Sequence, residues 1–308
     1  SLALMGGFGL LAPGARVIGG TSIYDGHGYE PGGASSEPAS KRSRKQRKQA
    51  RQSGTVIADY LDPEWSRLIG TEVGFIFQNP IASWTPDHVI GEQAGEALDY
   101  HTDLSVDEIE TRVYDALGEV ELPKSARLFG AYRHQLSRGM AQRAMLAAAL
   151  TKAPKLLIAD EPLNGLDPSV AAAIMDLLRD MQRRRGMAMV VVTHDLAAVA
   201  GLADSVAVMY SGEFVERAPA RDIYHHPKHP YTAGLVGSIP GFTQGRLRHI
   251  PGEAPRLPDT IRGRCVFVDR CDFATDVCWS ESPGLQQVGA SLVACHHASE
   301  LELPGIRG

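Results

Sequence analysis

The chain has 308 residues, of which 44% are hydrophobic, and this composition is ordinary for a globular protein of about two domains. Its formal net charge of −5 argues against a protein that binds nucleic acid over its whole surface. No stretch reaches the roughly 18 apolar residues that cross a bilayer, and the apolar start lacks the basic leader of an export signal. We therefore expect any link to a membrane to run through a partner.

The first sixty residues divide into two parts by composition. Residues 1–30 combine apolar runs with Gly and Pro, which indicates a helix end followed by a strand and a turn. Residues 31–60 are rich in Gly, Ser, Pro and basic side chains, and the run 41–51 carries basic residues and no acid. We expect a disordered, solvated insertion here. Contact of the basic run with lipid headgroups or nucleic acid is the alternative.

From residue 72 onward, strand and helix patterns alternate. A β-branched and aromatic run over 72–78 predicts a strand, and residues 90–118 carry helical patterning with a capping box that begins at Ser105. The other expected elements are helices over 139–150 and 168–184, strands over 156–161 and 187–193, a helix capped by Asp195, and a hairpin over 206–216. Strands that alternate with helices predict a parallel α/β sheet.

Two adjacent carboxylates, Asp160 and Glu161, end the most apolar of these strands. Residues 156–159 have the composition of a buried parallel strand. Carboxylates at the carboxyl end of such a strand lie at the rim of the sheet, where ligands bind. One of them can hold a hydrated Mg²⁺ while the other polarises a water. Two solvated acids at a strand end are the alternative, which the pair alone does not exclude.

Further polar features occur in a fixed order along the chain. Gln78 ends the first strand, Ser137 and Gly139 open a helix, Asp167 precedes another helix, and His194 ends a strand. Each of them alone has an ordinary structural explanation, such as helix capping. Their joint order, and the kind of element that each occupies, are hard to obtain by chance. No G-x-x-x-x-G-K-[ST] phosphate loop occurs in the 308 residues.

In these motifs the chain resembles the nucleotide-binding subunit of an ABC transporter, from residue 1 to the end apart from the 31–60 insertion. The resemblance implies an α/β fold with an incomplete RecA-like P-loop NTPase core over 1–220, a helical subdomain over 80–140, and ATP and Mg²⁺ as ligands. The opening residues resemble the helix that follows the family's Gly-Lys-Ser/Thr. We therefore expect the chain to lack the N-terminal segment with the Walker A loop, and Ser1 to be the last residue of that loop.

The resemblance also assigns roles around the two acids. Gln78 corresponds to the Q-loop glutamine, which senses Mg²⁺ and nucleotide and relays to the membrane domain. Asp160 is implied to lie on the Mg²⁺ side of the Walker B strand, and Glu161 to be the general base or the group that orients the attacking water. His194 corresponds to the switch histidine that contacts the γ-phosphate.

The implied signature motif contains Ser137 and Gly139, and Asp167 closes the D-loop. A helix N-terminus favours a phosphate, which in this family belongs to ATP held by the opposite subunit. The chain is then half of a head-to-tail pair. Arg138 replaces the first glycine of the usual Leu-Ser-Gly-Gly, where it either crowds the phosphate or adds a guanidinium contact to it.

The cysteines are confined to the end of the chain. Their clustering indicates a local metal or disulfide site rather than scattered core thiols. An iron–sulfur cluster, a structural Zn²⁺, and paired or free thiols are the three interpretations, although the short C-x₂₋₄-C pairs usual for zinc are missing. The four are Cys265, Cys271, Cys278 and Cys295.

The tail over 221–308 resembles the C-terminal extension of the dipeptide, oligopeptide and nickel-peptide importers, through His229-Pro230-Tyr231-Thr232 and the cysteine pattern. This resemblance implies a [4Fe–4S] cluster on the four cysteines and an ATP-driven motor for import of di- and oligopeptides. The implied partners are a second ATP-binding subunit, two transmembrane permease subunits and an extracytoplasmic peptide-binding protein, with no nucleic acid. The chain would lie on the cytoplasmic face of the membrane, docked through the Q-loop and residues 80–135.

Several alternatives remain. A chain without a phosphate loop could be a truncated, catalytically incompetent product with a structural or metal-binding role. A soluble ABC ATPase of DNA repair or translation is a further option, but such proteins lack this tail.

His225, His226 and His229 suggest a second metal site, yet their interleaving with prolines favours a rigid connector. Trp84 belongs either to a docking surface or to ordinary packing.

Overall fold

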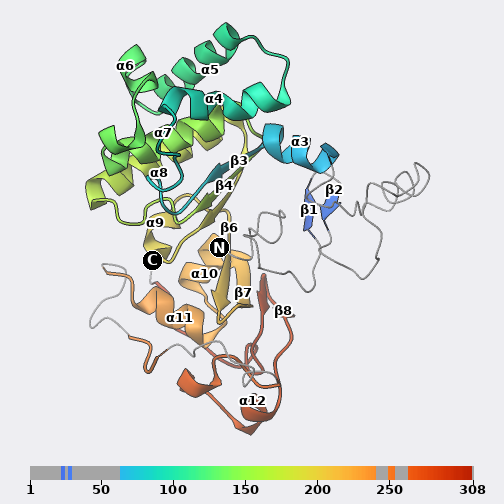
Figure 1. Cartoon of the computed structure of the whole chain (residues 1–308). Helices are drawn as coiled ribbons and strands as arrows, with labels where there is room; N and C mark the ends of the chain where they lie inside the picture. Colours follow the sequence, from blue (N-terminus) through green and yellow to red (C-terminus); the bar gives the residue numbers. More distant parts are fainter. Residues whose placement is uncertain (1–21, 25–26, 30–62, 241–248, 254–262, 307–308) are drawn as a thin grey trace, which may run out of the picture. The chain divides into compact units, whose positions relative to one another are not determined.

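The computed structural model describes residues 22–24, 27–29, 63–240, 249–253 and 263–306 (Figure 1). The chain divides between His194 and Asp195 into two compact units. Ser1 and the expected insertion at 31–60, with its basic run, lie outside the described residues. Within the described part of the chain, no helix is both long enough and apolar enough to span a membrane.

A parallel sheet in the order β3-β4-β5 lies in the first unit. Its strands are β3 (Val73–Ile76), β4 (Leu156–Asp160) and β5 (Ala188–Val192). The first four residues of β4 are buried, which confirms the buried parallel strand expected from its apolar run. The carboxyl ends of the three strands therefore meet at one edge of the sheet.

The strand expected over 72–78 is shorter in the structure. Glu72 is the last residue of helix α3 (Pro63–Glu72), and the chain leaves the sheet after Ile76. The prediction was too long because aromatic side chains favour a strand wherever they occur, whereas Phe77 is 42% exposed and unpaired in the sheet. Gln78 consequently lies in the loop beyond the strand end.

Helices of the first unit pack on one another and on β3 (Figure 1). Helix α7 approaches β3 closely, since a Cβ atom on Gly74 would lie 2.9 Å from the carbonyl oxygen of Ala149. The predicted capping box at Ser105 is confirmed, with Glu108 as its partner. The helices here are α4 (Ile90–His101), α5 (Val106–Glu119), α6 (Ala126–Phe129) and α7 (Arg138–Leu150), with a 3₁₀ turn at Arg133–Gln135.

Helix α8 (Pro168–Arg185) follows the loop that leaves β4. Asp167 precedes it and Pro168 occupies its first turn, where the missing N–H costs nothing. It ends at Gly186, whose φ of 61° is left-handed and suits glycine. Arg185 then donates to the carboxylate of Glu119 at 2.6 Å, which ties the end of α8 to α5.

A separate antiparallel pair, β1 (Ser22–Tyr24) and β2 (His27–Tyr29), precedes these elements.

The second unit begins with helix α9 (Leu196–Val199), whose predicted cap is confirmed because the Asp195 carboxylate accepts the N–H of Ala198 at 3.1 Å. An antiparallel sheet in the order β6-β7-β9-β8 follows. Its strands are β6 (Ser205–Tyr210), β7 (Glu213–Pro219), β8 (Gln286–Val288) and β9 (Ser291–Val293). The predicted domain boundary at 220/221 falls inside this unit, since β7 pairs with β9 from late in the tail.

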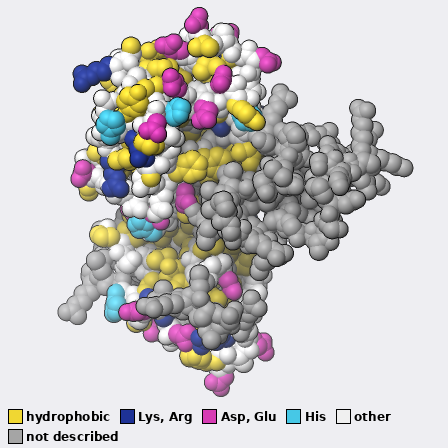
Figure 2. Space-filling model, viewed as in Figure 1, with side chains coloured by type: hydrophobic (Ala, Val, Ile, Leu, Met, Phe, Trp, Pro, Cys, Tyr) yellow, Lys and Arg dark blue, Asp and Glu magenta, His cyan; other side chains and the backbone are white. Residues whose placement is uncertain are grey.

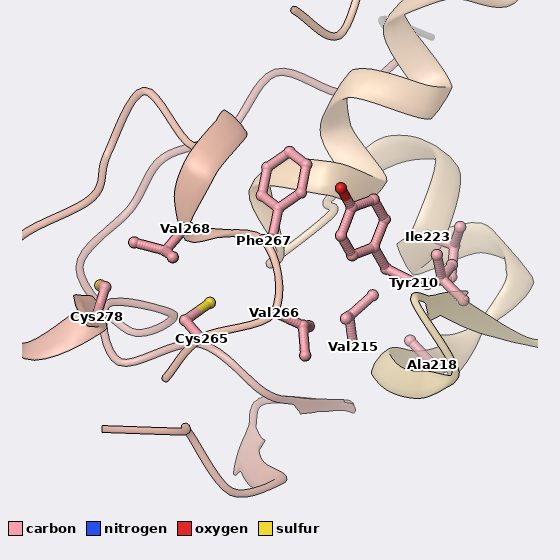
Figure 3. Close-up of a cluster of buried hydrophobic side chains, with 10 residues drawn as sticks. Tyr210, Val215, Ala218, Ile223, Cys265, Val266, Phe267, Val268 and Cys278 are labelled. Atoms are coloured by element: carbon pink, nitrogen blue, oxygen red, sulfur yellow. The ribbon is translucent and has the colours of Figure 1, made fainter. Parts of the chain in front are cut away.

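An apolar core in the second unit is shared by β6, β7 and the tail, and Figure 3 shows it around Phe267. The ring of Phe267 meets Tyr210 edge-on with 5.1 Å between centroids, and it also contacts Tyr231. Cys265 and Cys278 belong to the same buried cluster. The short helices around this core are α10 (Ala220–His225), α11 (Pro230–Gly237) and α12 (Asp276–Ser280), with a 3₁₀ turn at Val268–Arg270.

Candidate functional site

Glu161 is the first residue after β4 and has an unusual backbone conformation. Its φ is 45°, in the left-handed region that residues with a side chain seldom adopt. The surrounding structure holds it there, because the Glu161 N–H donates to the carbonyl oxygen of Val192 in β5 at 2.8 Å. Such backbone strain clusters at functional sites. The side chain is 27% exposed, so its carboxylate is reachable from solvent.

Three side chains converge on the Glu161 carboxylate. The Gln78 Nε2 donates to Oε2 at 3.0 Å, and the Asn164 Nδ2 donates to the same oxygen at 2.9 Å. The Nδ1 of His194 lies 3.6 Å from Oε1. Residues that follow β3, β4 and β5 thus meet at the carboxyl edge of the sheet, where the sequence predicts a ligand site.

Asn164 is the member of this group that sequence reasoning missed. It lies three residues after Glu161, and its own N–H also donates to the Glu161 carbonyl oxygen at 3.1 Å. The signal was present in the Asn164-Gly165 pair, since Asn before Gly is typical of a tight turn that folds back on itself. Two amide donors leave the carboxylate fixed in direction, so that it can accept a proton from a water placed on its open side.

Asp160 ends β4 beside Glu161 and is partly buried. The side-chain nitrogen of Gln78 donates to Glu161. The side-chain oxygen of Gln78 is the atom of this amide that could bind a cation. Carboxylate and amide oxygens at a sheet edge suit Mg²⁺, which keeps several waters and takes only one or two protein ligands. The donor set therefore fits the expected ion. Within the described residues, no three His, Cys, Asp or Glu side chains are arranged to hold a metal ion by themselves.

The predicted signature residues form a second group at the start of α7. Ser137 precedes the helix, and its Oγ accepts the N–H of Met140 at 3.2 Å. A Cβ atom on Gly139 would lie 3.3 Å from Val170 of α8, so this glycine lets two helices approach. Asp167 occupies the cap position of α8 but makes no capping hydrogen bond with its side chain.

Arg138 joins this group to the loop after Glu161. Its Nη1 donates to the carbonyl oxygen of Gly165 at 2.9 Å. Both sequence-based alternatives for this arginine concerned a bound phosphate, and neither anticipated a contact with the protein's own backbone.

The four cysteines come together in the second unit from separate segments. All are free thiols, and all but Cys271 are buried. Burial raises the pKa of Cys271 and of Cys295 to about 11, and the neighbouring cysteines add to the increase in both. The N–H of Cys265 donates to the carbonyl oxygen of Cys278 at 2.9 Å, which fixes two of the segments to each other. A bound cation would be needed to keep such thiols ionised.

The histidines of the predicted connector have structural partners. The Nδ1 of His225 lies 2.9 Å from the carbonyl oxygen of Ile306. His229 is buried, and its Nδ1 accepts the N–H of Tyr231 at 3.1 Å at the start of α11. The backbone N–H of His229 donates to the carboxylate of Glu216 at 2.9 Å. Trp84 is likewise buried, with its indole N–H donating to the carbonyl oxygen of Ala141 at 3.4 Å, so it belongs to packing.

Charged side chains are mixed on the face of the molecule that Figure 2 shows, with carboxylates and basic groups interspersed among apolar ones. This distribution accords with the small net charge of −5.

Comparison with known proteins identifies relatives for both parts of the chain. The family described as "ABC transporter" matches residues 43–164, and "Oligopeptide/dipeptide transporter, C-terminal region" matches residues 215–278. The dipeptide transport ATP-binding protein DppD of Haemophilus influenzae is 41% identical over 232 residues, which cover 75% of this chain and 70% of that protein. DppD of Escherichia coli is 41% identical over 248 residues, with coverage of 80% and 76%. Among solved structures, cbiO1 of Clostridium perfringens is 30% identical with a TM-score of 0.47, covering 55% of this chain and 64% of that one.

Proposed function

Because this chain belongs to the family of ABC transporter ATP-binding proteins that includes the dipeptide and oligopeptide transport proteins, we propose that it hydrolyses ATP to power the import of di- or oligopeptides. The observation that carries the proposal is the Glu161 carboxylate, which is held by Gln78, Asn164 and His194 at the carboxyl edge of a parallel sheet.

In the proposed reaction, Glu161 orients the attacking water and accepts its proton. Gln78 and Asn164 fix the direction of the carboxylate through their amide N–H groups. His194, which is 73% exposed, can turn its ring toward the γ-phosphate of a bound nucleotide. Asp160 and the Gln78 oxygen would hold Mg²⁺, which supplies charge neutralisation at the transferred phosphoryl group.

The signature residues serve a second nucleotide in this proposal. Ser137 and Gly139 lie at the N-terminus of α7, where unpaired N–H groups favour a phosphate, and Asp167 closes the adjoining loop. The phosphate would come from ATP on a second ATP-binding subunit, in a head-to-tail pair. Two transmembrane permease subunits and an extracytoplasmic peptide-binding protein complete the proposed transporter, with this chain peripheral on the cytoplasmic face.

The domains that we propose are those expected from the sequence analysis. Residues 1–220 form the nucleotide-binding domain, in which 80–140 is a helical subdomain that docks on the permease. Residues 221–308 form the extension typical of peptide importers. The match to the importer C-terminal region over 215–278 supports this assignment.

Peptide uptake by the reconstituted transporter tests the proposal. The 308 residues contain no phosphate loop, so the assay compares this chain with a loop-bearing form, in which G-x-x-x-x-G-K precedes Ser1 and Ser1 completes the motif. We expect the loop-bearing form in proteoliposomes to accumulate labelled dipeptide with ATP and not with a non-hydrolysable analogue. Hydrolysis without any peptide accumulation would contradict the transport function. Equal, Glu161-dependent activity in both forms would exclude the alternative that the 308-residue chain is catalytically incompetent.

We further propose that the four cysteines hold a [4Fe–4S] cluster. The chemistry of the donor set supports it, because four thiols come from separate segments and the neighbouring cysteines help to raise the pKa of Cys271 and of Cys295. The cysteines would hold the group and keep it in the apolar interior of the second unit.

Cys271→Ser is expected to remove the cluster. Anaerobically purified protein should carry about four iron atoms per chain and a broad brown absorbance, and the serine variant should lose most of both. The exposed Ser280, close to Cys278 in the sequence, gives a matched control, since Ser280→Ala should retain the iron. Colourless protein with one zinc per chain would instead establish a structural zinc site.

A further inference from the structure

The guanidinium of Arg138 occupies the space that a side chain at position 165 would need. Its Nη1 donates to the Gly165 carbonyl oxygen at 2.9 Å. A Cβ atom built on Gly165 would overlap Nη1 and lie 2.8 Å from Cζ. Arginine at 138 and glycine at 165 are therefore fitted to each other, although 27 positions separate them in sequence.

Gly165 is also required by its backbone. Its φ of 68° lies in the left-handed region, which glycine adopts without steric cost. The carbonyl oxygen that accepts from Arg138 is thus presented by a tight turn whose shape depends on this residue. A planar guanidinium with several donors is well suited to hold such a carbonyl group in place.

The same turn carries the group that orients Glu161. Asn164 directly precedes Gly165, and both its backbone N–H and its side-chain amide donate to Glu161. Glu161 itself is held at a φ of 45°, a conformation that persists only when its surroundings enforce it. A shift of the Gly165 peptide would therefore be transmitted through one residue to the hydrogen bonds of the carboxylate.

We propose that Arg138 is a positioning residue that ties the start of the signature helix α7 to the turn 163–166, and thereby fixes the orientation of the Glu161 carboxylate. The proposal rests on the proposed function to the extent that Glu161 directs the hydrolytic water. It gives the arginine, which stands where the family usually has glycine, a role within its own subunit.

The contact itself can be tested without any catalytic assay. In hydrogen exchange on the nucleotide-free chain, we expect Arg138→Ala to speed exchange of the 163–166 amides several-fold, and Arg138→Lys to speed it less. In a double-mutant cycle followed by Tm, Gly165→Ala should cost more in the wild-type background than in the Arg138→Ala background, where the steric overlap is absent and only the backbone strain remains. Additive effects and unchanged exchange would overturn the contact.

The positioning role has a separate readout in the reconstituted, loop-bearing transporter. Arg138→Ala should lower kcat for ATP hydrolysis about threefold to tenfold with KM changed less than about twofold, since misorientation of a catalytic group affects the chemical step. Arg138→Lys should recover part of the loss. Arg184→Ala, which removes an arginine that is 68% exposed near the end of α8, serves as the control and should leave both constants unchanged.

These two experiments separate the inference from the proposed function. If the wild-type transporter hydrolyses no ATP, the proposed function fails, while exchange and the mutant cycle still decide whether the contact exists. If the exchange of 163–166 accelerates but kcat stays the same in the Arg138→Ala variant, the contact is structural only and the positioning role is overturned.

Discussion

Glu161→Gln is expected to lower ATP hydrolysis by the loop-bearing transporter at least about 100-fold, while ATP affinity changes less than about twofold. The amide has nearly the same shape as the carboxylate and can still accept hydrogen bonds from Gln78 and Asn164 through its oxygen. It cannot take a proton from the attacking water at neutral pH. Phosphate release and fluorescent-nucleotide binding, measured on the same preparation, check the two halves of this expectation.

The control for Glu161→Gln is Glu253→Gln, an equal loss of charge at an exposed position of the tail. It should change neither quantity. A Glu161→Gln transporter that kept more than about a tenth of the wild-type rate would show that another group accepts the proton, and the assignment of the general base would be wrong.

Acid pH is expected to destabilise the second unit through His229. Burial lowers the pKa of this imidazole from 6.5 to about 4, and its Nδ1 must be unprotonated to accept the N–H of Tyr231. Because the pKa is lower in the folded state, the stabilisation is complete above pH 6.5 and is lost as the pH falls through about 4. At about 1.4 kcal/mol per pKa unit, this amounts to about 3 kcal/mol.

His229→Asn isolates this contribution, since the Asn side-chain oxygen can still accept the Tyr231 N–H but does not titrate. We expect the difference in unfolding free energy between wild type and the variant to shrink by about 3 kcal/mol from pH 7 to pH 4. Urea denaturation reports it through Trp279 fluorescence, in a background where Trp65 and Trp84 are replaced by Phe. The exposed His226 provides the control His226→Asn, for which no such change is expected.

Glu216, whose carboxylate accepts the backbone N–H of His229, also titrates. The effect of His229 on stability is therefore obtained only as the difference between wild type and His229→Asn. Burial raises the pKa of the Glu216 carboxyl, even though the N–H groups of Lys228 and His229 donate to it. The stability that this group contributes is therefore lost as the pH rises through its folded pKa, opposite in sign to His229. If the difference between wild type and His229→Asn stayed constant with pH, the imidazole would not be the acid-sensitive group.

The strands and the acidic centre could be predicted because each depends on local chemistry. The apolar run of β4 admits only a buried strand, and parallel strands must present Gln78, Glu161 and His194 at one edge. The cap at Asp195 and the capping box at Ser105 follow from side-chain hydrogen bonding to nearby N–H groups, so a few consecutive residues are enough to predict them.

The remaining features depend on contacts between distant segments. The hydrogen bond of Arg138 to Gly165 requires α7 and the loop after β4 to lie side by side, which no local pattern specifies. The gathering of the cysteines depends on how short helices and turns pack in the tail. The pairing of β7 with β9 is of the same kind, because a Pro-rich change in composition does not reveal which later strand pairs with β7.

The pairing of β7 with β9 has a consequence for how the protein is made on the ribosome. Glu216 and Arg217 in β7 pair with Val293 and Leu292, so one edge of the hairpin stays open until more than seventy further residues have been synthesised. An open strand edge can pair with other chains. The sheet of the second unit therefore closes late in synthesis, after all three strands of the sheet β3-β4-β5 have been made, and non-local pairing of this kind is slow and exposes the chain to aggregation.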